Sequence, residues 1–267
     1  MWKLLKIEWM KVKNYRTFWI LLGIIIISIP AFNYSFFTIH DNSFPKVKGK
    51  NILGSPFAFP DVWQTVSYNA SLLFLIPALL IITLVTNEFV YKTHRQNIID
   101  GLSRRQFINV KLFEILLLSI LCTFIVFLTG LVFGFIVNHP EPGIDPWQNF
   151  RFVGFYFVQM LSYSLIALLL SIFIKRAGLT LGIFMLYMLI ENMIVGISHN
   201  IYHTTWAYYL PEETTDRLIP QPYLKAIRTA ADNADWEHHI PIYLGLAALY
   251  AAIYCVVVTR RFLRSDL

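Results

Sequence analysis

Long runs of apolar residues alternate with short polar segments along the whole chain. Each run approaches the roughly 20 residues that a helix needs to cross the hydrocarbon core of a bilayer. The runs lack the every-second-residue alternation of membrane-barrel strands. We therefore predict an all-α polytopic membrane protein, a single domain over residues 1–267, with six spans at about Phe18–Phe37, Val66–Val85, Ile115–Val137, Phe152–Ile174, Leu179–Ile197 and Ile240–Val258.

The polar segments predict further elements. Residues 1–16 place Trp2, Trp9 and Val12 on one side of a helix with lysines off that line. This is typical of an amphipathic helix at the headgroup boundary, although positively charged flanking sequence is the alternative. The aromatic and acidic stretch 199–239 favours short interfacial or re-entrant helices before the last span, with a loosely ordered loop as the alternative. Proline and glycine predict mostly irregular backbone over 39–65 and 138–150.

The composition is that of a membrane protein, and the distribution of Lys and Arg predicts its orientation. Hydrophobic residues make up 57% of the chain and charged residues 14%, against about 25% charged in soluble domains. Fifteen Lys and Arg fall on the side of the termini and seven on the other side, which predicts cytoplasmic termini. The net charge of +6 then reflects topology and contact with anionic membrane lipids, and we expect no nucleic-acid binding. Cys122 and Cys255 fall inside predicted spans and are interpreted as packing residues.

Motifs for catalysis are absent from the sequence. It contains no G-x-x-x-x-G-K-[ST] phosphate loop, no H-E-x-x-H pair and no G-x-S-x-G elbow. We therefore expect no catalytic residue, no metal and no cofactor in this chain.

The segment 87–111, NEFVYKTHRQNIIDGLSRRQFINVK, carries the most specific pattern. The segment is too polar to lie in lipid and too short to form a soluble domain. It is also longer than a connection between two spans needs to be. Ser103 precedes Gln106 by three residues, the spacing of a capping box, so a helix should begin near Arg104. We interpret the segment as a contact for a cytoplasmic partner. The alternative is a solvated loop whose basic residues only enforce topology.

This segment resembles the membrane subunits of type-2 ABC exporters, as do the amphipathic N-terminus and the six spans. In that family the stretch reads roughly Glu, then Gly-Thr, a short helix, Pro-x-Ser-Arg and a Lys opening the next span. The matching positions here are Glu88, Thr93, Ser103, Arg104 and Lys111. The chain departs from the pattern at Lys92, where Gly is usual, and at Gly101, near the usual Pro.

The resemblance implies a coupling helix at about Phe89–Leu102, so residues 87–111 are called the coupling segment from this point. It implies a separate ATP-binding subunit that holds ATP and Mg, a second permease chain (identical or paralogous), export as the direction, and the bacterial plasma membrane as the location. The residues expected to contact the ATP-binding subunit are Glu88, Phe89, Tyr91, Lys92, Thr93, Arg95, Ile98, Ile99, Ser103, Arg104 and Arg105. The alternatives are a non-transporting membrane anchor or assembly factor, and a polytopic membrane enzyme.

Other polar and small residues inside the apolar regions are secondary candidates. Glu191, followed by Asn192, lies within the fifth span and is either a substrate-pathway or proton-linked residue or a hydrogen-bonded residue that fixes helix packing. The small-residue pairs Gly130/Gly134 and Gly178/Gly182 permit close helix approach, including that of a second chain. Four external histidines, His199, His203, His238 and His239, would suit a metal or haem, but interfacial histidines without metal are the commoner case. The aromatic, mostly uncharged spans suit a hydrophobic or amphipathic cargo.

Overall fold

The computed structural model describes residues 9–10, 12–43, 46–47, 50–51, 55–93, 96, 99, 101–137, 145–224 and 230–264. Over these residues the chain is almost entirely helical. The helices and strands are α2 (Arg16–Ser43), β1 (Lys46–Val47), β2 (Lys50–Asn51), α3 (Val62–Ser71), α4 (Leu75–Val90), α6 (Arg104–Val137), α7 (Arg151–Ile174), α8 (Ala177–Asn200), η1 (Trp206–Tyr209), α9 (Pro211–Asp216), η2 (Pro222–Leu224) and α10 (Ala230–Arg264).

Five described helices are long and apolar enough to cross a membrane, and the pair α3 and α4, which meets at a bend of 46°, counts as a sixth candidate if it is one broken span. The prediction of an all-helical membrane protein is therefore confirmed, with five to six candidate spans. The helices exceed the predicted apolar runs. Helix α6 begins at Arg104 rather than Ile115, and α10 at Ala230 rather than Ile240, because helical backbone continues past the apolar part of each span.

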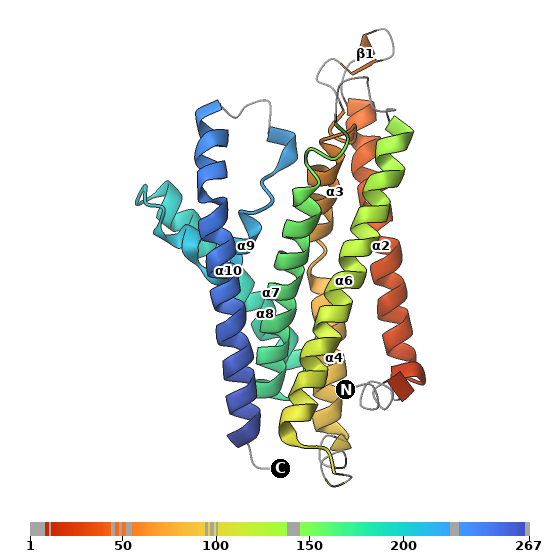
Figure 1. Ribbon diagram of the computed structural model, residues 1–267, viewed down its shortest axis with the longest axis vertical. Helices are drawn as coiled ribbons and strands as arrows, with labels where there is room; N and C mark the ends of the chain where they lie inside the picture. Colours follow the sequence, from red (N-terminus) through yellow and green to blue (C-terminus); the bar gives the residue numbers. More distant parts are fainter. Residues whose placement is uncertain are drawn as a thin grey trace.

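The candidate spans run alternately up and down one bundle, with α3 and α4 following one another in the same direction (Figure 1). The first residues of α2, the connections from α4 to α6 and from α7 to α8, and the last residues of α10 all lie at its lower end. This end is called the coupling end. The arrangement agrees with an even number of crossings, which the charge count also requires.

Helix α7 is the centre of the bundle. It contacts α3, α4, α6, α8, α9 and α10, and 61% of its most apolar stretch is buried, against 22% for α2 and α8 and 17% for α10. The outer helices therefore present apolar faces to lipid or to another chain. In a bilayer such faces carry no hydrophobic penalty.

Buried polar side chains tie the elements near the break in the second span. Asn69 of α3 donates to Asn33 Oδ1 of α2 at 3.0 Å and accepts from the Tyr223 hydroxyl at 2.9 Å. Gln64 of α3 donates to Pro220 O at 2.7 Å. Hydrogen bonds between helices supply part of the specificity that the hydrophobic effect cannot supply in lipid.

The flanking segments agree in part with the sequence predictions. In the amphipathic segment 1–16, Trp9, Met10, Val12 and Lys13 are helical, and the helix ends before α2 begins; residues 1–8 and 11 lie outside the described residues. The predicted short helices before the last span are present as η1, α9 and η2. Segment 39–65 is less irregular than predicted, because α2 continues to Ser43 and β1 pairs antiparallel with β2, with Lys46 opposite Asn51.

Candidate functional site

The backbone of the coupling segment turns sharply at two places. Helix α4 ends at Val90, and Lys92 then adopts a left-handed φ of 55°. Thr93, Gln96 and Ile99 are helical, and Gly101 has a φ of 98° before α6 begins. The predicted start of the coupling helix at Phe89 is therefore wrong, because Phe89 still belongs to α4. Of the predicted contact residues, Arg95 and Ile98 lie outside the described residues.

The left-handed backbone at Lys92 bears on one departure from the family pattern, the replacement of glycine by lysine. Residues with a Cβ pay about 1–2 kcal/mol in this conformation, and glycine does not. Lys92 occupies such a position, where the resemblance has glycine. Glycine would adopt this backbone conformation without the strain that Lys92 bears.

The predicted capping box is confirmed. The Gln106 backbone N–H donates to Ser103 Oγ at 3.2 Å, and the Ser103 backbone N–H donates to Gln106 Oε1 at 3.0 Å. These two bonds satisfy donors that the first turn of α6 would otherwise leave open. They fix where α6 starts and therefore how the coupling segment enters the bundle.

Large apolar side chains at the tip of the segment face outward. Tyr91 is 72% exposed and Ile99 is 83% exposed, and Lys92 and Arg105 are exposed beside them. Ser103 is also exposed and Thr93 is half-buried. Exposed aromatic and aliphatic side chains next to basic ones have the composition of an anchor with a charged rim.

Other predicted contact residues point into the chain instead. Glu88 is buried and forms an ion pair with Lys111, which also lies 3.1 Å from Glu114. Phe89 packs edge-on against Phe262, and Lys175 lies over its ring. Glu88 and Phe89 therefore link α4 to the rest of the bundle, a role that the sequence prediction did not include.

Arg104 likewise makes an internal contact. Its Nη1 donates to Leu263 O at 2.7 Å, and Phe107, one turn later, stacks on Phe262 with 4.8 Å between the ring centroids. The first turn of α6 is thus fastened to the last turn of α10. The coupling segment is held between the ends of α4, α6, α7 and α10.

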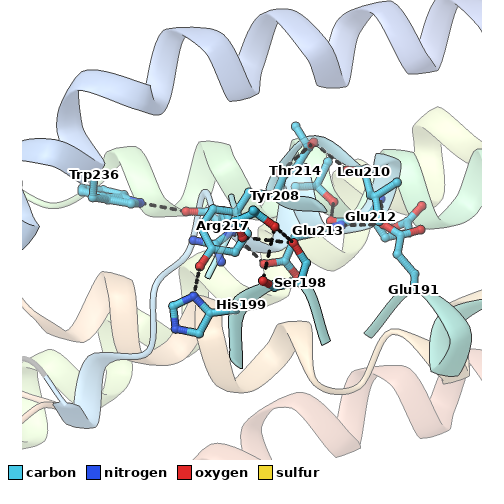
Figure 2. A network of polar contacts seen from close by, with 12 residues as sticks. Glu191, Ser198, His199, Tyr208, Leu210, Glu212, Glu213, Thr214, Arg217 and Trp236 are labelled. Atoms are coloured by element: carbon cyan, nitrogen blue, oxygen red, sulfur yellow. Dashed lines mark hydrogen bonds and ion pairs between the residues drawn. The ribbon is translucent and has the colours of Figure 1, made fainter. Parts of the chain in front are cut away.

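A second polar site surrounds Glu191 at the middle of the bundle. The carboxyl of Glu191 is buried, and its Oε1 accepts backbone hydrogen bonds from Glu212 at 2.7 Å and Glu213 at 2.9 Å (Figure 2). Glu191 of α8 therefore caps the first turn of α9. This arrangement agrees with the interpretation of Glu191 as a hydrogen-bonded residue that fixes helix packing. Asn192 is exposed and bonds only its own helix, through Met188 O at 2.9 Å.

The other end of α9 is fastened to α7. Asp216 Oδ1 accepts from Gln159 Nε2 and from the Tyr163 hydroxyl, both at 2.7 Å. Burial raises the pKa of Asp216 to about 6, against the effect of these two donors, which lower it. Glu191, Glu212, Glu213 and Asp216 together form the acid cluster.

Arg217 closes the acid cluster on one side. Its guanidinium pairs with Glu213 at 2.7 Å and lies over the Tyr208 ring, while its carbonyl accepts from Trp236 Nε1 at 2.7 Å. Figure 2 shows this network joining α8, η1, α9 and α10. Burial raises the pKa of Glu213, and Arg217 opposes that rise.

The four histidines that the sequence singled out do not form a metal site among the described residues. His199 pairs with the Tyr208 hydroxyl, whereas His239 lies on α10 and bonds Asp235 O at 2.8 Å. Among the described residues, no group of three or more His, Cys, Asp or Glu side chains is arranged to hold a metal ion.

The glycines of α6 face residues of the same chain. A Cβ on Gly130 would lie 2.9 Å from the Trp63 ring, and one on Gly134 would meet the Phe59 ring. This pair therefore serves packing inside the chain and gives no support to a dimer contact. Gly178 and Gly182 of α8 have no atom within 4 Å of the position of a Cβ.

An apolar cavity of about 790 Å³ lies between α2, α4 and α6 toward the coupling end. Its walls are largely aliphatic and aromatic, and Lys111 and Glu114 supply the charged groups of its lining. The described residues that line it are Trp9, Val12, Phe18, Leu22, Leu80, Ile81, Leu84, Val85, Lys111, Phe113, Glu114, Ile115, Leu117, Leu118 and Leu121. Its size and chemistry are those of a site for a small amphipathic molecule.

Sequence reasoning missed most of the acid cluster. Its signal was present in the polar hexapeptide PEETTD between two apolar runs, and in Gln159 and Tyr163 inside a span. What the sequence did not reveal is that these two polar positions meet.

Comparison with known families identifies a transporter family. The family described as "ABC-2 family transporter protein" matches residues 4–191, well over half of the chain. No curated protein matches the chain.

Proposed function

The chain belongs to the ABC-2 family of transporter proteins, and from this premise we propose that it is the membrane subunit of an ATP-driven exporter. In this proposal two permease chains form the substrate pathway, and a separate ATP-binding subunit docks on the coupling segment of each. The sequence has no phosphate loop of its own, so ATP hydrolysis is assigned to the partner.

One observation carries the proposal: the coupling segment is exposed at its tip and fastened at its base. Tyr91 and Ile99 are more than two-thirds exposed, while Phe89 and Arg104 contact the ends of α7 and α10. A loop that only enforced topology would need neither property. A segment that receives force from a partner needs both.

The chemistry of the apolar cavity supports an amphipathic small molecule as the cargo. Apolar walls with a few charged groups suit an amphipathic molecule, such as a lipid or a drug-like compound. Filling the cavity with Leu117→Trp should reduce stimulation of ATP hydrolysis by such compounds while leaving the complex with the ATP-binding subunit intact. Unchanged stimulation would exclude the cavity as the cargo site.

The docking proposal is tested by purifying the tagged chain from its host with any phosphate-loop ATPase that accompanies it. Tyr91→Ala and Ile99→Ala should each weaken the complex. Loss of a central interface anchor costs about 2 kcal/mol, or roughly 30-fold in Kd. The matched controls are Tyr202→Ala and Ile201→Ala, side chains 69% and 66% exposed just beyond the other end of α8.

The control pair should leave both complex formation and ATP hydrolysis unchanged. Equal behaviour of the test and control variants would contradict docking through this tip. Recovery of a partner without ATPase activity would favour the membrane-anchor alternative.

A further inference from the structure

Helix α9 is a polar helix inserted among the apolar helices α7, α8 and α10. Nearly all of its polar side chains have hydrogen-bond partners or ion pairs. Thr214 donates to Leu210 O at 2.6 Å and Thr215 to Glu212 O at 2.9 Å, and Glu213 and Asp216 are paired as described above. The exception is the Glu212 carboxyl. The side chain is 2% exposed, and among the described residues neither of its oxygens has a well-formed hydrogen bond, the contact with the Ser162 hydroxyl being weak.

The surroundings of Glu212 would oppose a negative charge. Helix α8 contributes Glu191, and α9 itself contributes Glu213 and Asp216, so the charged groups nearest to it are acids. Among the described residues, the polar neighbours that bear on it are neutral hydroxyls: Ser162 and Tyr163 on α7, Tyr187 on α8 and Tyr254 on α10.

In the part of the chain that the structure describes, the cation of this network, Arg217, is already engaged. Arg217 pairs with Glu213 at 2.7 Å and lies over the Tyr208 ring. An ionised carboxyl that is buried without a paired cation is far costlier than its neutral form. Burial raises the pKa of Glu212 well above its ordinary value, Asp216 and Glu191 add to the rise, and Ser162 opposes it.

We propose that Glu212 is a proton-binding site, held as a neutral carboxylic acid, and that its proton keeps α9 docked against α7, α8 and α10. The geometry makes docking and protonation interdependent. The backbone N–H of Glu212 is capped by Glu191, so ionising the Glu212 side chain would place a second carboxylate beside the capping one. Loss of the proton therefore disfavours the docked position of the whole helix.

The direction of the pH dependence follows from linkage. A carboxyl whose pKa is raised in the docked state binds its proton more tightly there than when α9 is released into water. Docking is therefore fully favoured below the ordinary pKa of glutamate, and this contribution is lost as the pH rises through the raised value. Glu212→Gln, which resembles the neutral acid in shape, should keep α9 docked at all these pH values.

Infrared spectroscopy of the full-length protein in lipid nanodiscs measures the proton directly. We expect the carbonyl band of a protonated carboxylic acid near pH 7.5, above the value of about 6 for Asp216. The band should be absent in Glu212→Gln and present in Glu237→Gln. Glu237 is an exposed glutamate on α10 that is paired with Arg151. Absence of the band in the unaltered protein would overturn the proposal whether or not the variants fold.

Hydrogen exchange over residues 206–217 measures docking. At each pH the unaltered protein is compared with Glu212→Gln, which cancels the intrinsic pH dependence of exchange. Protection of these amides from exchange should fall in the unaltered protein, relative to the variant, as the pH is raised. Equal protection at every pH would overturn the proposal that the Glu212 proton keeps α9 docked. The series is repeated with choline in place of sodium. A loss of protection on removing sodium would assign the site to a sodium ion instead of a proton.

Discussion

Replacing Gly130 with Ala tests whether the close approach of α6 to Trp63 lies inside one chain. The new Cβ would lie 2.9 Å from Cε3 and Cζ3 of the ring, whereas carbon atoms are optimally separated by about 3.5–4.0 Å. The ring cannot readily move aside. It is 1% exposed, stacks on Phe127 and Trp147, and donates to Pro146 O at 2.7 Å.

The size of the effect follows from two opposing contributions. Overpacking of this kind costs about 1–3 kcal/mol, and replacing a helical Gly with Ala gains roughly 1 kcal/mol. Gly245, inside α10, has no atom within 4 Å of its Cβ position, so Gly245→Ala carries only the gain. The difference between the variants isolates the overpacking cost, and at about 2–4 °C per kcal/mol it should separate their Tm values by roughly 2–12 °C.

The assay is thermal unfolding of the purified variants, with chemical cross-linking to measure dimer content. We expect Gly130→Ala to unfold at the lower temperature and to show the same dimer content as the unaltered chain. Equal Tm values would refute the packing argument. Loss of dimer without loss of stability would place Gly130 at an interface between two chains.

Three further predictions concern single residues. Lys92→Gly should raise the free energy of unfolding by up to about 1 kcal/mol, because an exposed left-handed residue loses its Cβ strain; unfolding that is unchanged or easier would argue against the turn. Lys111→Met should lower the free energy of unfolding by about 3–5 kcal/mol, because the buried Glu88 loses its paired ammonium. Adding Glu88→Gln should recover part of that loss, and the Tm values of the single and double variants test this. For Asp216, whose pKa is raised from 3.8 to about 6, protons bind more tightly in the folded state, so its stabilising contribution should fall as the pH rises from about 4 through 6. Asp216→Asn can still accept from Tyr163 and should flatten this part of the stability profile measured by thermal unfolding.

Features set by residues close together in the chain were predicted from the sequence. The capping box of Ser103 and Gln106 spans three residues, and each transmembrane run is a continuous stretch of apolar residues. Such patterns depend on local backbone geometry, so they can be read without knowing the tertiary contacts. The start of the coupling helix was missed because helical periodicity does not reveal where one residue, Lys92, turns left-handed.

Features set by distant residues were not predicted. Asp216 meets Tyr163 across 53 residues and Gln159 across 57, and Glu191 meets Glu212 across 21. Glu88 and Lys111 were both singled out in the sequence, but their mutual pairing became visible only when α4 and α6 were placed side by side. A polar residue in an apolar run signals that a partner exists, but not which residue it is.

The hydrogen bond from Arg104 to Leu263 O joins the start of α6 to the end of the long helix α10. With 35 residues, at a rise of 1.5 Å per residue, the helix is roughly 52 Å long, and tilting it by about 6° about one end displaces the other by roughly 5 Å. Along its length α10 carries Tyr250, which donates to Tyr209 O at 2.8 Å, and Trp236, which donates to Arg217 O at 2.7 Å. A tilt of α10 about the coupling end would therefore displace the residues on either side of α9 by more than those near Leu263.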